Sequence, residues 1–198
     1  MKAFYIAAAA AALVCGSATA QNLVVNGGFE NGYADWTAQN FMILNYGDYA
    51  YPTHSGTWSA ATGCVSPTAL QYCYLSQVLN TQAGSAYTLS FWVDNDYANP
   101  GTDNQQYRVA WGGQDLGTVN FDGLSWAQVT YTGLIASSGS TELALYGRND
   151  PAAMFFDDVS VTAQGSAPEP ASWAMMLGGF GLLGGAIRAR RKTAIAFA

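Results

Sequence analysis

The stretch AYTLSFWVD, residues 86–94, decides the fold class of this protein. Its side chains fall into two alternating sets, and a β-strand directs alternating side chains to opposite faces of a sheet. The two sets are Tyr87, Leu89, Phe91 and Val93, and Thr88, Ser90, Trp92 and Asp94. The pattern predicts a strand with one face against a hydrophobic core and the other facing outward.

The same kind of segment recurs through residues 22–162. Short runs rich in β-branched and aromatic residues are separated by Gly, Asn, Asp and Pro, and none shows sustained helical periodicity. This punctuation is typical of an antiparallel sandwich or barrel. We therefore expect one all-β domain over residues 21–163.

Two of these segments carry a more specific signal. Residues 105–110 and 117–121 flank a stretch that contains Gly112 and Gly113, and paired glycines favour the tight connection of a hairpin. The last strand, residues 154–162, is predicted to place Asp157 on the same face as Phe155, Val159 and Val161. A buried carboxylate must be paired or bound to a metal ion.

The charge of this domain excludes one class of partner. Residues 21–165 contain two basic residues, Arg108 and Arg148, against twelve acidic residues, a net charge of −10. Nucleic-acid binding requires clustered Lys and Arg, so nucleic acid is not expected as a partner. Cations and neutral ligands such as sugars are compatible with this charge.

The N-terminus, residues 1–20, has the composition of a cleaved signal helix. Lys2 precedes an apolar run that ends in Ala18-Thr19-Ala20, and small residues at these positions suit a signal peptidase. Lipidation of Cys15 is disfavoured because Val14 precedes it.

Export places Cys64 and Cys73 in an oxidising compartment, where a disulfide is favoured over free thiols or a metal site.

The C-terminus contains a second apolar segment. Residues 171–187 follow a linker over 164–170, and these 17 residues are near the lower limit of roughly 17 to 25 for a transmembrane helix. The basic tail, residues 188–198, would stop the helix on the cytoplasmic side through Arg188, Arg190, Arg191 and Lys192. A core helix is disfavoured because Gly-Gly pairs and a basic end pack poorly.

The order Pro168-Glu169-Pro170, a Gly/Leu-rich span and an arginine cluster resembles the PEP-CTERM sorting signal of Gram-negative bacteria. Residues 193–198 extend beyond the usual end of that signal. The resemblance implies an exported protein that is anchored transiently in the inner membrane and processed by an exosortase-type enzyme. It also implies release to the cell surface or the extracellular polysaccharide matrix.

The segments at the two ends of the domain resemble galactose-binding-like jelly rolls of the carbohydrate-binding-module type. These segments are residues 22–32 and 155–161. The resemblance implies an antiparallel jelly-roll β-sandwich in which the first and last strands are neighbours. Glu30 would then approach Asp157 and Asp158, and oxygen ligands favour a structural Ca²⁺ there. The alternative is that Asp157 accepts hydrogen bonds from backbone amides.

The outward residues of the predicted strands suggest a sugar-binding surface. Trp92 and Asp94 lie at such positions, as do Tyr146 and Arg108 in their own strands. Aromatic faces stack on sugar rings and polar groups bind hydroxyls. Trp92 could instead pack against the Cys64 loop, which leaves open a structural or adhesive matrix protein without sugar recognition.

Catalysis is not expected. The one histidine, His54, lies in a Pro-Thr-His-Ser-Gly turn with no acidic residue close in sequence, and this favours a surface turn residue. The sequence has no Gly-x-Ser-x-Gly motif and no metal-ligand spacing.

Overall fold

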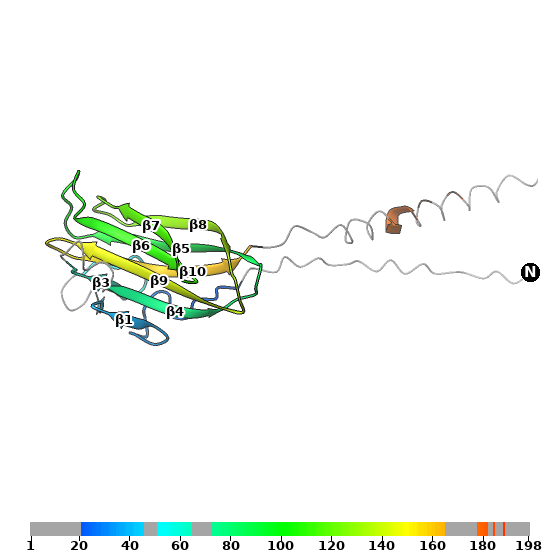
Figure 1. The fold of residues 1–198 in the computed structure, drawn as a ribbon, viewed down its shortest axis with the longest axis horizontal. Coiled ribbons are helices and arrows are strands. Elements are labelled where there is room, and N and C mark those ends of the chain that lie inside the picture. Colours follow the sequence, from blue (N-terminus) through cyan, green and yellow to red (C-terminus); the bar gives the residue numbers. More distant parts are fainter. Residues whose placement is uncertain are drawn as a thin grey trace, which may run out of the picture. The chain divides into compact units, whose positions relative to one another are not determined.

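The computed structural model describes residues 21–45, 51–64, 73–164, 178–181, 184 and 188. The chain divides into two compact units, residues 1–163 and 164–198. The described part of the first unit is a sandwich of two five-stranded sheets (Figure 1). All strand pairs within both sheets are antiparallel. The all-β jelly-roll prediction is therefore confirmed.

The first sheet, called the β4–β9 sheet, has the strand order β1-β4-β9-β6-β7. Its strands are β1 (Thr37–Gln39), β4 (Tyr74–Asn80), β9 (Ser140–Asn149), β6 (Gln105–Trp111) and β7 (Gln114–Asn120). The second, the β5–β10 sheet, has the order β2-β3-β10-β5-β8. Its strands are β2 (Met42–Asn45), β3 (Trp58–Thr62), β10 (Met154–Ala163), β5 (Ala86–Asn95) and β8 (Ala127–Ile135).

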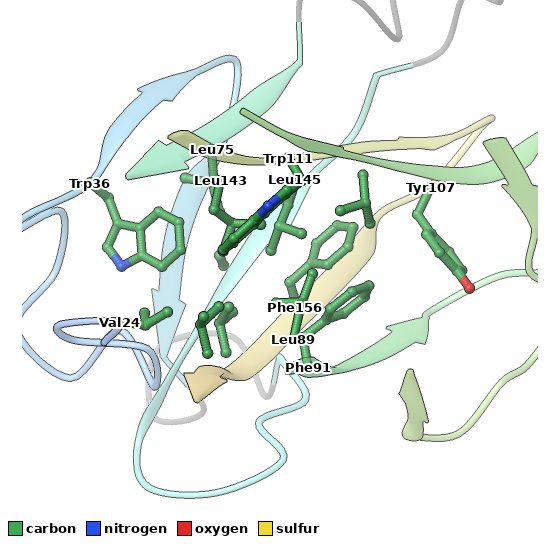
Figure 2. Close-up of a cluster of buried hydrophobic side chains, with 14 of the residues drawn as sticks. Val24, Trp36, Leu75, Leu89, Phe91, Tyr107, Trp111, Leu143, Leu145 and Phe156 are labelled. Carbon is green, nitrogen blue, oxygen red and sulfur yellow. The ribbon is translucent and has the colours of Figure 1, made fainter. Parts of the chain in front are cut away.

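The core lies between the two sheets and contains the predicted inward face of β5. Phe91 is fully buried and contacts Phe156 of its own sheet and Tyr107 of the other sheet, with ring centroids 5.9 and 5.7 Å apart. Figure 2 shows these rings among the aliphatic side chains of both sheets. Burial of this continuous apolar layer is the main favourable contribution to folding.

A β-bulge in β10 corrects the predicted faces of the last strand. The register with β5 shifts between Asp157 and Ser160, and Asp158 has a positive φ of 48°. As a result Phe155 and Asp157 precede the bulge on the outer side, whereas Val159 packs in the core after it. The sequence prediction placed all three on one face, which is wrong because a bulge reverses the alternation.

The β6–β7 hairpin is confirmed, but its turn is shorter than predicted. Gly112 and Gly113 alone connect the strands, and both have positive φ, 56° and 81°. Positive φ at both central residues is the geometry that glycine permits and that matches strand twist. The strands therefore continue through Trp111 and from Gln114.

Cys64 and Cys73 form the predicted disulfide, with a Cα–Cα distance of 6.4 Å. The predicted signal helix, residues 1–20, lies outside the described residues. Of the predicted membrane helix, residues 178–181 and 184 are described, and they are helical. In the described part of the chain, no helix is long and apolar enough to cross a membrane.

One end of the core is polar. Gln105 and Asn149 are opposite each other in the β6–β9 pair, and both are fully buried. The Asn149 Nδ2 atom lies within hydrogen-bonding distance of Asn95 Oδ1, Tyr97 O and Ala153 O, at 3.2, 2.9 and 2.9 Å. Neither polar atom of the Gln105 amide has a partner among the described residues. The Asn149 amide is therefore stabilised by hydrogen bonds in the core, whereas the buried Gln105 amide has none among the described residues.

We expect Gln105→Leu to leave the free energy of unfolding unchanged or to raise it by about 1 kcal/mol, because an unpaired buried amide is replaced by an apolar group. Asn149→Leu should lower it by about 3 kcal/mol, because buried carbonyls lose their donor. Urea denaturation measures both. Equal losses in the two variants would show that the Gln105 amide is paired.

Candidate functional site

The outer face of the β4–β9 sheet presents a pair of tyrosines. Leu143 and Leu145 of β9 face the core, so Tyr146 faces outward. Tyr74 is its register partner on β4, and the two ring centroids are 5.8 Å apart with a tilt of 45°. Both rings are half-buried. They form an amphipathic surface of the kind that contacts sugar rings.

Arg108 covers part of this surface. Its guanidinium carbon lies 3.7 Å from the centroid of the Tyr146 ring, and Nη1 donates a 3.0 Å hydrogen bond to Asp115 Oδ2. The Gly117 amide donates to Asp115 Oδ1, and this bond, followed by the bond from Arg108, lowers the pKa of the Asp115 carboxyl. Arg108 is therefore fixed over Tyr146 by a cation–π contact and an exposed ion pair.

A cavity of about 560 Å³ adjoins the tyrosine pair. Along β4 it is lined by the successive outward residues of that strand, and it is bounded by the N-terminal segment, the loop before β1, the first residue of β1 and one residue of β9. The lining residues are Tyr74, Ser76, Val78 and Asn80, with Gln77, Leu23, Val25, Asp35, Thr37 and Glu142. Its volume is that of a small-ligand site.

The walls of this cavity are held by a buried amide. Gln77 is 6% exposed, and its Nε2 atom donates to the carbonyls of Val25 and Asp35, while its Oε1 atom accepts from the Val25 amide. These bonds fix the N-terminal segment and the loop before β1 to β4. The cavity is therefore formed before any ligand binds.

The structure does not bring the predicted sugar-binding residues together. Tyr146 and Arg108 lie on the β4–β9 sheet, whereas Trp92 and Asp94 lie on β5 in the other sheet. Asp94 is only 6% exposed, contrary to the outward position expected from alternation, and burial raises the pKa of its carboxyl. The sequence did not predict the cavity residues of β4, because the alternation within one short strand does not show which other segments lie beside it.

The 51–57 segment covers the outer face of the β5–β10 sheet near Trp92. The His54 ring stacks on the Trp92 ring, with centroids 3.8 Å apart and 14° between the planes. Tyr51 contacts Phe155 of β10, with ring centroids 6.0 Å apart. Trp92 is thus covered by the 51–57 segment, whereas the alternative expectation was packing against the Cys64 loop, of which residues 65–72 lie outside the described residues.

His54 lies in a bend and is half-exposed, in agreement with the prediction of a turn residue. Its Nδ1 atom lies 2.6 Å from Asp158 Oδ2, so the histidine has an acidic partner that is distant in sequence but adjacent in space. Ser55 Oγ donates to Asp158 Oδ1 at 2.7 Å. His54 is thus a turn residue whose ring also contacts β10.

Side-chain atoms of Glu30, Asp157 and Asp158, here called the acidic cluster, lie near Gly28. A Cβ at Gly28 would lie 3.5 Å from Asp158 Oδ1, 3.8 Å from Asp157 Oδ1 and 4.0 Å from Glu30 Cγ. Asp157 is fully buried, and burial is the main cause that raises the pKa of its carboxyl to about 6. The two arginines of the domain form their contacts elsewhere.

These carboxylates bind the backbone of the 51–57 segment and its junction with β3. Asp157 Oδ2 accepts hydrogen bonds from the amides of His54 and Ser55, at 2.9 and 3.2 Å. Glu30 Oε1 accepts from the amides of Thr57 and Trp58, at 2.7 and 3.0 Å. The alternative of backbone hydrogen bonding at Asp157 is therefore realised. In the described ranges, no group of three or more His, Cys, Asp or Glu side chains is arranged to hold a metal ion.

A substitution at Gly56 tests how strongly the acidic cluster holds the 51–57 segment. Gly56 and Gly32 have nearly equal positive φ, 61° and 63°, but a Cβ at Gly56 would overlap the Glu30 carboxylate, whereas at Gly32 there is open space. We expect Gly32→Ala to cost about 1 kcal/mol from backbone strain alone. Gly56→Ala should cost about 3 kcal/mol, because Glu30 also loses charge-assisted hydrogen bonds. Equal losses in urea denaturation would contradict this role of Glu30.

Comparison with known proteins identifies the tail. Residues 166–192 match the PEP-CTERM protein-sorting motif, which includes Pro168, Glu169 and Pro170. The match indicates a chain sorted for export through its C-terminus. No curated protein sequence matches the chain.

Solved structures similar to the domain include carbohydrate-binding modules. TmCBM61 in complex with beta-1,4-galactotriose is 14% identical with a TM-score of 0.55, over 73% of this chain and 99% of that one. A family 16 carbohydrate-binding module is 19% identical with a TM-score of 0.52, over 71% and 99%. The CBM22-1 xylan-binding domain from Paenibacillus barcinonensis Xyn10C is 14% identical with a TM-score of 0.52, over 77% and 100%.

At these identities the likeness establishes the fold alone. The jelly-roll sandwich and the sorting motif occupy separate parts of the chain. The protein therefore carries a PEP-CTERM protein-sorting motif at residues 166–192, C-terminal in sequence to a domain with the jelly-roll fold of carbohydrate-binding modules.

Proposed function

We propose that the domain binds carbohydrate on the outer face of the β4–β9 sheet and does so without catalysis. The observation that carries this proposal is the continuity of the cavity with the tyrosine pair, because Tyr74 belongs to both. Sugars have apolar faces and hydroxyl edges. The tyrosine rings match the faces, and Ser76, Asn80 and Thr37 supply polar groups for the hydroxyls.

The names of the similar structures support this ligand class. One was solved with beta-1,4-galactotriose and another is a xylan-binding domain. A shared fold does not determine the ligand, so the ligand is assigned here from the residues on the outer face of the β4–β9 sheet. Tyr74, Tyr146 and Arg108 are the proposed contacts, and Trp92 and Asp94, which lie on the other sheet, are not part of this proposed site.

We also propose how the protein is exported and processed. An exosortase-type enzyme would cut near Pro168-Glu169-Pro170, after the basic residues have held the chain in the inner membrane. The domain would then reach the cell surface and bind polysaccharide of the extracellular matrix. Its charge of −10 over residues 21–165 agrees with a neutral or cationic ligand.

Tyr74→Ala and Tyr146→Ala should each weaken glycan binding about tenfold, which corresponds to about 1.4 kcal/mol from lost stacking. The measurement is a glycan array with the full-length protein in detergent, followed by titration calorimetry on the glycan bound. Tyr97→Ala is the matched control, because Tyr97 is exposed and does not line the cavity.

A folded protein that binds no glycan would overturn the proposal and favour a structural or adhesive matrix protein. Binding that Trp92→Ala abolishes, with Tyr74→Ala unaffected, would move the site to the opposite face.

We also propose that Ca²⁺ binds at the acidic cluster of Glu30, Asp157 and Asp158. The donors are oxygens only, and Asp157 is a fully buried carboxylate without a cationic partner among the described residues. Because these side chains are not arranged to hold an ion in the described residues, the three carboxylates would turn from part of their hydrogen bonds to ligate it, with a backbone carbonyl or water completing the shell. The ion would neutralise their charge and stabilise the 51–57 segment.

Calcium at 100 times its Kd should stabilise the domain by about 2.7 kcal/mol, and the shift in melting temperature should disappear in chelator. Differential scanning calorimetry measures the shift. Asp157→Asn should abolish it, and Glu142→Gln, which removes a carboxylate outside the cluster, should retain it. The same melting temperature in calcium and in chelator would show that backbone hydrogen bonds alone satisfy these carboxylates.

A further inference from the structure

We infer that the cavity on β4 binds a positively charged amino sugar, a 2-amino-2-deoxyhexose residue of a glycan. This inference rests on the proposed function and specifies its ligand. The starting observation is that two acidic residues line the cavity from different elements. Asp35 lies in the loop before β1, and Glu142 lies on β9 directly opposite Val78 of β4.

Both carboxylates are free to receive a ligand. Asp35 and Glu142 are exposed, and among the described residues neither side chain forms an ion pair or a hydrogen bond. The Asp35 backbone carbonyl, by contrast, is fixed by the Gln77 amide. The loop that carries the Asp35 carboxylate is therefore anchored while the carboxylate itself is unpaired.

No basic side chain of the described domain neutralises the cavity. Arg108 is bound to Asp115 and lies over Tyr146. Arg148 is 2% exposed, and it donates to the Asp103 carbonyl and the Asn104 side chain. A cleft lined by one sign of charge concentrates ligands of the opposite sign. The cavity therefore favours a cation and repels a uronic acid.

The remaining lining specifies a sugar and not a simple cation. Tyr74 and Val78 provide apolar surface, and Val78 is 67% exposed although it lies at the centre of a strand. Ser76 and Asn80 alternate with them along the same face and offer hydrogen-bonding groups. An amino sugar combines an ammonium group for the carboxylates with a ring face for Tyr74 and hydroxyls for Ser76 and Asn80.

The test compares β-1,4-linked hexamers of glucosamine, N-acetylglucosamine and glucose, and a hexamer of galacturonic acid, with the full-length protein in detergent. The glucosamine hexamer should bind at least tenfold more tightly than the N-acetylated hexamer, and galacturonate should not bind. Because the attraction is between exposed charges, high salt should reduce this preference.

Glu142→Gln and Asp35→Asn should each lower the affinity for the glucosamine hexamer by more than the affinity for the N-acetylated hexamer. Asparagine tolerates the positive φ of 66° at Asp35, so the loop is retained. Asp122→Asn removes an exposed carboxylate outside the cavity and should have no effect.

Two failures are distinguishable. Equal binding of the three neutral and amino hexamers, or tight binding of another glycan with none of glucosamine, would overturn this inference and leave carbohydrate binding standing. Absence of binding to every oligosaccharide would overturn the proposed function as well.

Discussion

The bulge in β10 is the constraint on which the rest of the domain depends. At Val159 the strand meets the Asn26-Gly27-Gly28 segment, where the Val159 amide donates a 2.9 Å hydrogen bond to the Gly27 carbonyl. A Cβ at Gly27 would overlap the Val159 carbonyl, so this close approach requires glycine. The bulge turns Asp157 outward and Val159 inward, which joins the first and last segments of the domain and completes the core.

The outward turn of Asp157 also determines which face of the sandwich is closed. Asp157 and Asp158 bind the 51–57 segment, and that segment covers Phe155 and stacks His54 on Trp92. The outer face of the β4–β9 sheet carries instead a cavity beside a tyrosine pair. The acidic cluster therefore holds the 51–57 segment over the outer face of the β5–β10 sheet. The outer face of the β4–β9 sheet is the candidate binding surface.

The charge of the domain acts at two levels. Within the acidic cluster it is compensated locally, by backbone amides of the 51–57 segment and, in our proposal, by calcium. At the cavity it is uncompensated, since Asp35 and Glu142 have no basic neighbour among the described residues. A structural role and a recognition role are thus distributed over different carboxylates of one acidic domain.

The sequence by itself determined the all-β class, the inward face of β5, the β6–β7 hairpin, the disulfide and the sorting tail. Each of these depends on local periodicity, on paired glycines, on the oxidising compartment or on a contiguous motif. Tertiary structure alone decided that Trp92 and Tyr146 lie on different sheets and that His54 meets Asp158. Alternation gives the face of a strand but not its sheet, and one bulge reverses even the face. The cavity, made by β4, β9 and the N-terminal segment together, could not be read from any one of them.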